Sequence, residues 1–264
     1  MTEHVDRKGR RVTFGTVAEL YDRVRPTYPD AVFDDIAELA GLERGSRVVE
    51  IGPGPGKATS ELVRRGYAVT GVELSADLAA IARRNVPDAE IVVADFEEWE
   101  PDAAGFDAIC AFAAFHWISP ELRYAKTARL LKPGGALAVV HGTHVLPTDG
   151  DPFFAEVQEA YDAAVPHPDN RAPGPPEEVG SQFGDEFLAS GVFERVEERR
   201  HLQSLTFSAD TFVGLLGTFS ANLVLPPAQR EELFRRVHAR ITARPSGIVT
   251  KHYLLELAVG YLPR

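Results

Sequence analysis

Cysteine is almost absent from this chain of 264 residues. Cys110 is the only one, so an intrachain disulfide is excluded. It lies in the apolar run FDAICAF, which predicts a buried, small hydrophobic side chain rather than a reactive thiol.

Long hydrophobic runs are also lacking. The longest apolar stretch, TFVGLLGTFSANLVL, is interrupted by polar residues and is shorter than the roughly 18 apolar positions of a membrane span. The opening MTEHVDRKGRR is charged and has no apolar segment of the secretory type. We therefore expect a cytoplasmic protein without a membrane partner.

Positive charge is scarce as well. Lysine and arginine number 28 against 39 aspartates and glutamates, and the formal net charge is −11. No basic stripe is present to neutralise phosphates, so nucleic acid is excluded as a partner. With 44% hydrophobic and 25% charged residues, the composition is that of a globular chain. We expect a monomer or homodimer.

What the chain has in quantity is an alternation of short apolar runs with helical patterns. RVVEI, AVTGV, EIVVA, FDAICAF and GALAVV follow one another within about one hundred residues. This order predicts βαβ units and a parallel sheet buried on both faces, an α/β fold. Ser75 is a candidate helix N-cap, Ser119 with Pro120 a second, and KPGG a turn.

Two regions lie outside this regular core. Residues 1–41 hold two helical patterns, and residues 143–190 hold one, PFFAEVQEAYDAA, followed by a proline-rich segment. We interpret 1–264 as a single domain with an N-terminal helical cap over 1–41 and a lid or insertion over 143–190.

The stretch VVEIGPGPGKAT raises the question of its ligand. A dinucleotide loop requires a small residue where Lys57 stands, and a phosphate P-loop requires one more residue before its Gly-Lys pair. Pro53 and Pro55 each remove an amide donor that a phosphate would need, and Glu50 adds negative charge. The loop therefore favours a cationic ligand without phosphate, such as S-adenosylmethionine.

Here the sequence resembles the class I S-adenosylmethionine-dependent methyltransferases. An acidic residue before G-x-G-x-G matches Glu50, Gly52, Gly54 and Gly56, and a second acidic residue matches Glu73 in VTGVELS. VVADFEEW, FDAICAFAAFHWI and ARLLKPGGALAVV follow in the family's order. The resemblance implies a Rossmann-like, doubly wound sheet of seven strands, mostly parallel with an antiparallel last strand and helices on both faces.

The resemblance also implies roles for individual residues. In the family, the carboxylate matching Glu73 binds the ribose hydroxyls of the cofactor. The other residues expected at the cofactor are Tyr21, Leu74, Asp95, Phe96 and Phe112.

FGTVAELYDRVRPTYP and HWI are similar to a small-molecule branch that includes the trans-aconitate methyltransferases. The substrate contacts implied are Tyr28, His116, Trp117 and His144. For the two tyrosines, simple core packing remains the alternative.

His116 is the candidate catalytic residue. A carboxylate acceptor needs no base, whereas a hydroxyl, amine or carbon acid would use a histidine as proton acceptor. His116 is thus either a base or a substrate contact. His141 and His144 are possible substrate contacts without further clustered ligands, so no metal site is predicted. Arg25 is placed either near the cofactor or in a surface ion pair.

We favour methyl transfer from S-adenosylmethionine to a small-molecule carboxylate. A module that binds this cofactor without chemistry is one alternative, because a fold and a cofactor site do not prove turnover. A nicotinamide-dependent oxidoreductase is another, disfavoured by Lys57.

Overall fold

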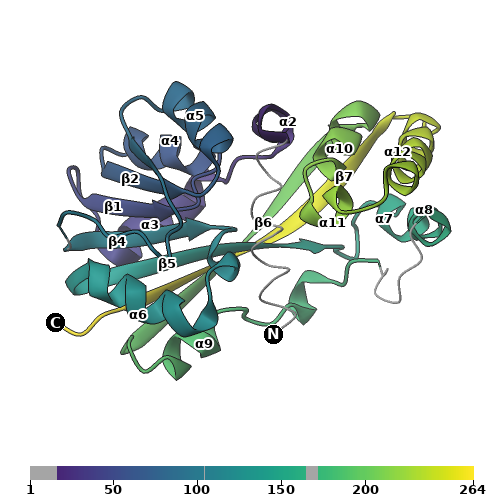
Figure 1. The fold of residues 1–264 in the computed structure, drawn as a ribbon. Helices are drawn as coiled ribbons and strands as arrows, with labels where there is room; N and C mark the ends of the chain where they lie inside the picture. Colours follow the sequence, from purple (N-terminus) through teal and green to yellow (C-terminus); the bar gives the residue numbers. More distant parts are fainter. Residues whose placement is uncertain (1–16, 104, 165–171) are drawn as a thin grey trace.

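The computed structural model describes residues 17–103, 105–164 and 172–264. Seven strands form one sheet in the order β3-β2-β1-β4-β5-β7-β6, with helices on both faces (Figure 1). The strands are β1 (Arg47–Ile51), β2 (Ala68–Glu73), β3 (Glu90–Val93), β4 (Phe106–Phe112), β5 (Leu131–Val145), β6 (Arg195–Ser208) and β7 (Ile248–Tyr261).

The pairing follows the predicted fold class. Strands β1 to β5 pair in parallel, and β7 runs antiparallel to both of its neighbours, β5 and β6. The mostly parallel sheet with an antiparallel last strand is therefore confirmed. The inner strands β1 and β4 are apolar and buried almost throughout, because helices cover both of their faces.

The helices begin and end close to the expected signals. They are α2 (Ala18–Val24), α3 (Asp30–Ala40), α4 (Lys57–Arg64), α5 (Ala76–Asn85), α6 (Pro120–Leu130), α7 (Phe153–Glu156), α8 (Gln158–Ala164), α9 (Gly184–Ala189), α10 (Ala209–Leu216), α11 (Ser220–Leu223) and α12 (Pro227–Thr242). Short 3-10 turns lie at Phe115–Trp117 and Pro176–Glu178.

Of the two predicted caps, one has the expected geometry. Ser75 Oγ accepts the amide of Leu78 at 3.3 Å, as an N-cap does. Pro120 occupies the first turn of α6 as expected, but Ser119 Oγ is bonded to the Glu121 carboxylate and makes no side-chain cap to this helix. The hydroxyl donates its proton to the acid two residues further on, and its oxygen accepts no amide of the first turn.

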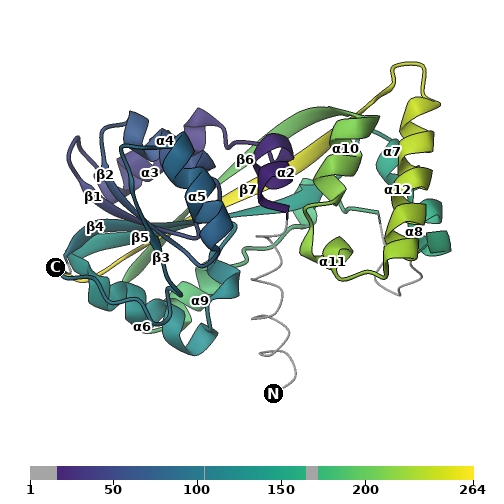
Figure 2. The ribbon, with the colours of Figure 1, turned by 45° about the horizontal axis from the view of Figure 1, so that its top comes forward.

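We call the part of the molecule around β1 to β4 the first lobe. The long strands β5, β6 and β7 extend beyond it and form part of a second lobe. There α7, α8, α10, α11 and α12 pack around the strand ends, and α2 lies between α5 and α10 (Figures 1 and 2). The region proposed as a lid, 143–190, thus begins inside β5, and its expected single helix is divided into α7 and α8. No described helix has the length and apolarity needed to cross a bilayer.

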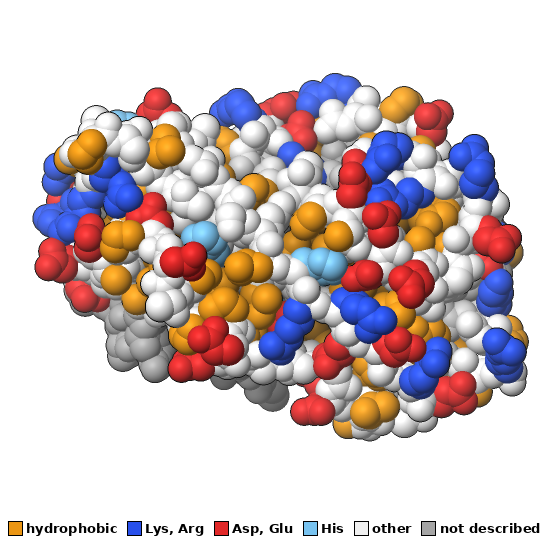
Figure 3. Space-filling model, turned by 180° about the vertical axis from the view of Figure 1, so that it is seen from behind, with side chains coloured by type: hydrophobic (Ala, Val, Ile, Leu, Met, Phe, Trp, Pro, Cys, Tyr) orange, Lys and Arg blue, Asp and Glu red, His pale blue; other side chains and the backbone are white. Residues whose placement is uncertain are grey.

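Charged side chains are mixed on the face shown in Figure 3. Basic and acidic groups lie next to one another around its rim, and hydrophobic and histidine side chains lie toward the middle. This face therefore carries no extended surface of one sign.

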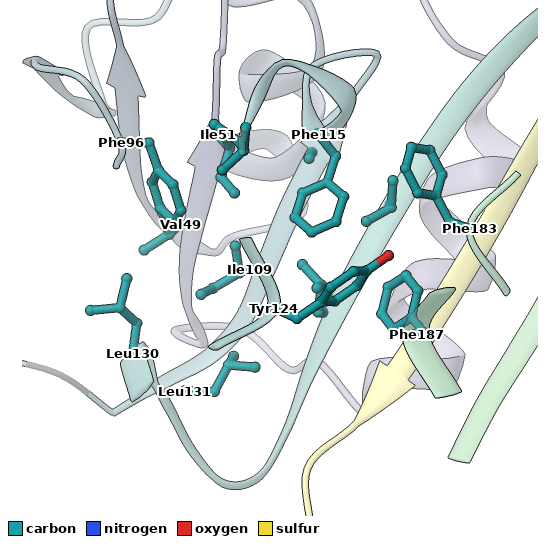
Figure 4. Close-up of a cluster of buried hydrophobic side chains, with 14 of the residues drawn as sticks. Val49, Ile51, Phe96, Ile109, Phe115, Tyr124, Leu130, Leu131, Phe183 and Phe187 are labelled. Carbon is teal, nitrogen blue, oxygen red and sulfur yellow. The ribbon is translucent and has the colours of Figure 1, made fainter. Parts of the chain in front are cut away.

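Aromatic rings close the core beside β4 and β5. Phe115 of the 3-10 turn, Tyr124 of α6, and Phe183 and Phe187 at the start of α9 and within it converge there (Figure 4). Phe115 meets Tyr124 edge to face, with ring centroids 5.4 Å apart. This packing fixes the segment after β4, which carries the histidine of HWI.

Candidate active site

Glu50 lies near the carboxyl end of β1 and is almost fully buried, with 1% of its surface accessible. Its carboxylate accepts a hydrogen bond from Thr59 Oγ1 at 2.6 Å. Burial raises its pKa to about 8, although the Thr59 hydrogen bond lowers it and nearby Glu73 raises it further. Glu50 is therefore mainly protonated at neutral pH while no cation faces it.

The glycine loop after β1 requires three left-handed residues. Gly52, Gly54 and Gly56 have φ of 63°, 59° and 90°. A Cβ on Gly52 would lie 2.9 Å from Ala114 Cβ, and one on Gly56 would lie 2.9 Å from Val86 Cγ2. A Cβ on Gly54 would meet its nearest neighbour, Tyr21 Cε1, only at 3.9 Å. Gly52 and Gly56 serve close packing, whereas Gly54 borders open space.

Glu73, at the carboxyl end of β2, fixes this loop. Its Oε2 accepts the amide of Gly54 at 2.9 Å, and Oε1 accepts the amide of Ser75 at 2.8 Å. The carboxylate thereby connects the glycine loop to the start of α5, and it stays at the edge of a cavity.

That cavity, which we call the loop cavity, has a volume of about 320 Å³. Most residues predicted to bind cofactor or substrate border it. Its lining includes Tyr21, Arg25, Gly52, Gly54, Glu73, Leu74, Phe96, Phe112, His116, Trp117, His141, Phe219, Ser220 and Ala221. Gly56 and Asp95 are not among the described residues that line it; Asp95 accepts the amide of Glu97 at 3.0 Å instead.

A second, smaller cavity adjoins the first and holds the two tyrosines. Tyr21, Tyr28, Glu50, Gln203 and Tyr253 are among its lining residues, and Tyr21 is shared with the loop cavity. The ring of Tyr28 also packs on Phe112, with centroids 5.1 Å apart. Tyr28 thus combines packing with access to this tyrosine cavity.

Three rings that line the loop cavity lie close to one another. His116 lies 4.8 Å from Trp117 and 5.8 Å from His141, measured between ring centroids. Burial lowers the pKa of His141, so this ring is neutral at pH 7. Its Nδ1 is buried without a hydrogen-bond partner in the described part of the chain. His144 lies apart from this group, in a third cavity of the second lobe.

Arg25 connects the two lobes above the loop cavity. Its Nε donates to Thr218 Oγ1 at 2.8 Å, and its Nη2 donates to the Thr218 carbonyl at 2.9 Å. The guanidinium also lies over the rings of Tyr21 and Phe219. Of the two roles open for Arg25, the structure shows the position beside the cavity.

Sequence reasoning did not single out Ala113 or Lys251. Ala113, with φ of 52°, is the one described non-glycine residue in the left-handed region, and it borders both the loop and tyrosine cavities. Lys251 is buried in β7. The sequence does contain a signal for Lys251. This residue lies on the same inward side of the alternating run in β7 as Val249, and a lysine is rare at such a buried position.

Within residues 17–103, 105–164 and 172–264, no group of three or more histidine, cysteine, aspartate or glutamate residues is arranged to hold a metal ion.

Comparison with known proteins identifies the region that carries the glycine loop. Residues 48–135 match a family described as methyltransferase domain. Residues 48–135 are thus similar to a methyltransferase domain. The matched segment begins in β1 and ends inside β5, so it includes Glu50, Glu73 and His116.

Relatives of the methyltransferase domain include curated proteins. An uncharacterized methyltransferase of Mycobacterium tuberculosis is 30% identical over 158 residues, covering 55% of this chain and 63% of that protein. A trans-aconitate 2-methyltransferase of Rhodopseudomonas palustris is 38% identical over 108 residues, covering 40% of this chain and 42% of that protein. The matches thus span less than two thirds of these relatives' own length.

A solved structure shows the same fold over nearly the whole chain. A protein of Anaeromyxobacter dehalogenans, proposed to be a type II methyltransferase, superimposes with a TM-score of 0.66. It is 22% identical, and the alignment covers 91% of this chain and 99% of that one. The Rossmann-like methyltransferase fold therefore extends beyond the matched domain segment.

Proposed function

We propose that this protein transfers a methyl group from S-adenosylmethionine to a carboxylate of a small-molecule acid. One observation carries the proposal: Gly54, Glu73, His116 and His141 line the same loop cavity. A cofactor held by the first two would direct its reacting end toward the two histidines.

The residues of the loop cavity suit this cofactor. Glu73 would accept the ribose hydroxyls, and Leu74 and Phe96 would supply apolar contact to adenine. Tyr21 and buried Glu50 would receive the cationic methionine end, beside the loop whose Gly54 leaves space for it. When bound, S-adenosylmethionine supplies a methyl group already activated by the sulfonium.

The protein's contribution is then to orient the acceptor and exclude water. An ionised carboxylate attacks without a base, so no residue has to remove a proton. Neutral His141 offers a hydrogen bond from a ring whose Nδ1 has no described protein partner, and the Arg25 guanidinium adds positive charge. These groups favour an acid over an amine. The trans-aconitate 2-methyltransferase relatives support the same acceptor class.

Thermal denaturation with S-adenosylhomocysteine or NAD tests the cofactor part of the proposal. A ligand that binds only the native state raises its apparent stability, so S-adenosylhomocysteine should raise Tm and NAD should not. The opposite pattern would assign the site to a nicotinamide. Stabilisation by S-adenosylhomocysteine without methyl transfer to any acceptor would support the non-catalytic binding module.

A further inference from the structure

Lys251 lies in β7 with only 5% of its surface accessible. No hydrogen bond or ion pair joins its Nζ to any residue in the described part of the chain. Two aromatic rings lie close enough to offset part of its charge: Nζ lies 5.5 Å from the centroid of Phe154 and 4.9 Å from that of Tyr253. An almost fully buried lysine is rare unless it is paired.

The ammonium borders a cavity of about 310 Å³ in the second lobe, which we call the lysine cavity. His144 borders it too, and His144 Nε2 is buried without a hydrogen-bond partner among the described residues. Phe154, Phe212 and Leu216 supply apolar walls, and Gln158, Tyr161 and Asn222 line the cavity as well. Two polar groups without partners among the described residues, Lys251 Nζ and His144 Nε2, thus belong to the lining of one cavity.

The lysine cavity is a neighbour of the proposed reaction site. Phe219 and Ala221 line both the lysine cavity and the loop cavity. A ligand reaching from the one to the other would pass along the segment between α10 and α11, which Arg25 holds through Thr218.

Burying an uncompensated cation costs free energy, and ring faces recover only part of it. A ligand carboxylate would complete the site, because a charge-assisted hydrogen bond to Lys251 and one to His144 would satisfy both groups.

We propose that Lys251 and His144 bind an anionic group at the end of the acceptor remote from the reacting atom. The acceptor is then an acid with two anionic ends separated by an apolar stretch that matches the aromatic walls. This inference rests on the proposed methyl transfer only where it identifies the opposite end of the acceptor as the group that is methylated. Anion binding by the lysine cavity does not depend on the proposed function.

The burial of Lys251 and the charges around it predict that the affinity of the lysine cavity for an anion depends on pH. Burial, with some help from the Arg25 charge, lowers the pKa of Lys251 to about 7. The other titratable groups near it are His144, His252, Tyr253 and Tyr161, and desolvation raises the pKa of Tyr161 to about 12. An anion binds the protonated lysine, so its affinity should fall as pH rises above about 7.

Calorimetry with simple acids in the presence of S-adenosylhomocysteine tests the proposal without turnover. The dicarboxylates adipate and suberate are compared with hexanoate and octanoate, which lack the second anion. At pH 6.5 the better dicarboxylate should bind at least about tenfold tighter than the monocarboxylate of equal length. Lys251→Met should abolish this preference, and the surface substitution Lys132→Met, which removes the same charge, should keep it.

Equal binding of both acid types by the wild type, no binding of any of them, or a preference that survives Lys251→Met would overturn the proposal. Replacing a buried ammonium by an apolar side chain should not reduce Tm at neutral pH, which separates lost binding from lost folding. As an independent readout, nitrogen NMR of the five lysines should show one Nζ whose pKa rises when suberate binds. An absence of methyl transfer would refute the proposed function and leave these binding results in force.

Discussion

Glu73 is the residue on which the cofactor assignment depends most. Its carboxylate holds the Gly54 and Ser75 amides at the edge of the loop cavity, where the ribose would lie. We expect Glu73→Ala to weaken S-adenosylhomocysteine binding by at least about tenfold, since each charge-assisted hydrogen bond lost is worth about 1.5–3 kcal/mol. Titration calorimetry measures this. Glu90→Ala, which removes an exposed carboxylate bonded to Thr70 at the start of β3, is the control and should bind normally. An unchanged Kd for folded Glu73→Ala would contradict the assignment.

The raised pKa of Glu50 leads to a prediction about proton release when the cofactor binds. Its pKa of about 8 lies above neutral pH, so the free protein carries the proton there. A cationic ligand beside the carboxylate favours ionisation, and binding of S-adenosylmethionine at pH 7 should release a proton. Affinity should therefore increase as pH rises from 7 to 8 and level off above. Calorimetry in two buffers of different ionisation enthalpy detects the release, and Glu50→Gln should eliminate it. Identical heats in both buffers for the wild type would show that no cation reaches Glu50.

His116 distinguishes two kinds of acceptor. With a carboxylate acceptor, His116→Gln should keep most of kcat and mainly raise KM. With a phenol, alcohol or carbon acid, the loss of a base should lower kcat by about 10²–10⁴. The pH dependence of kcat for both forms decides between them. A wild-type profile that rises through a histidine-like pKa and becomes flat and very low in the variant would make His116 the base.

At the scale of elements, the loop between β1 and α4 is the one whose contact with the cofactor can be tested by substitution. Gly54 borders the cavity at φ 59°, and Gly41, after α3, has φ 61° with nothing within 4 Å of an added Cβ. Valine at either position incurs a similar backbone strain of about 1–2 kcal/mol. Only Gly54→Val should lose S-adenosylhomocysteine binding. If both variants bind it with wild-type affinity, the loop does not contact the ligand.

The elements of the first lobe were largely predictable from the sequence. RVVEI and FDAICAF coincide with β1 and β4, because buried parallel strands read as continuous apolar runs. Errors arose where local signals compete. Ser119 bonds to Glu121 rather than capping α6, and PFFAEVQEAYDAA is two helices rather than one. The acidic strand ends and the glycine loop could be located, but not that Gly56 packs on Val86 while Gly54 faces the cavity.

The whole molecule has a second lobe that local patterns did not reveal. GALAVV predicted the inner part of β5, but the strand continues to Val145 because β7 pairs with it from Ala136 to Val145. Such pairing joins residues over one hundred positions apart, and no window of sequence contains it. Lys251 pairs with Leu205 of β6 and His144 pairs with Tyr253 of β7, so the lysine cavity could be found only in the assembled structure.

Transfer of a labelled methyl group tests the central claim most directly. The protein is incubated with methyl-labelled S-adenosylmethionine and a panel of small acids, phenols and amines, and products are separated and treated with base. We predict label in an acid, in a form that base hydrolyses to methanol, as expected of a methyl ester, and about tenfold or more lower kcat/KM at subsaturating cofactor for Glu73→Ala. Label that stays on a phenol or amine after base treatment, or no transfer to any acceptor, would contradict the account.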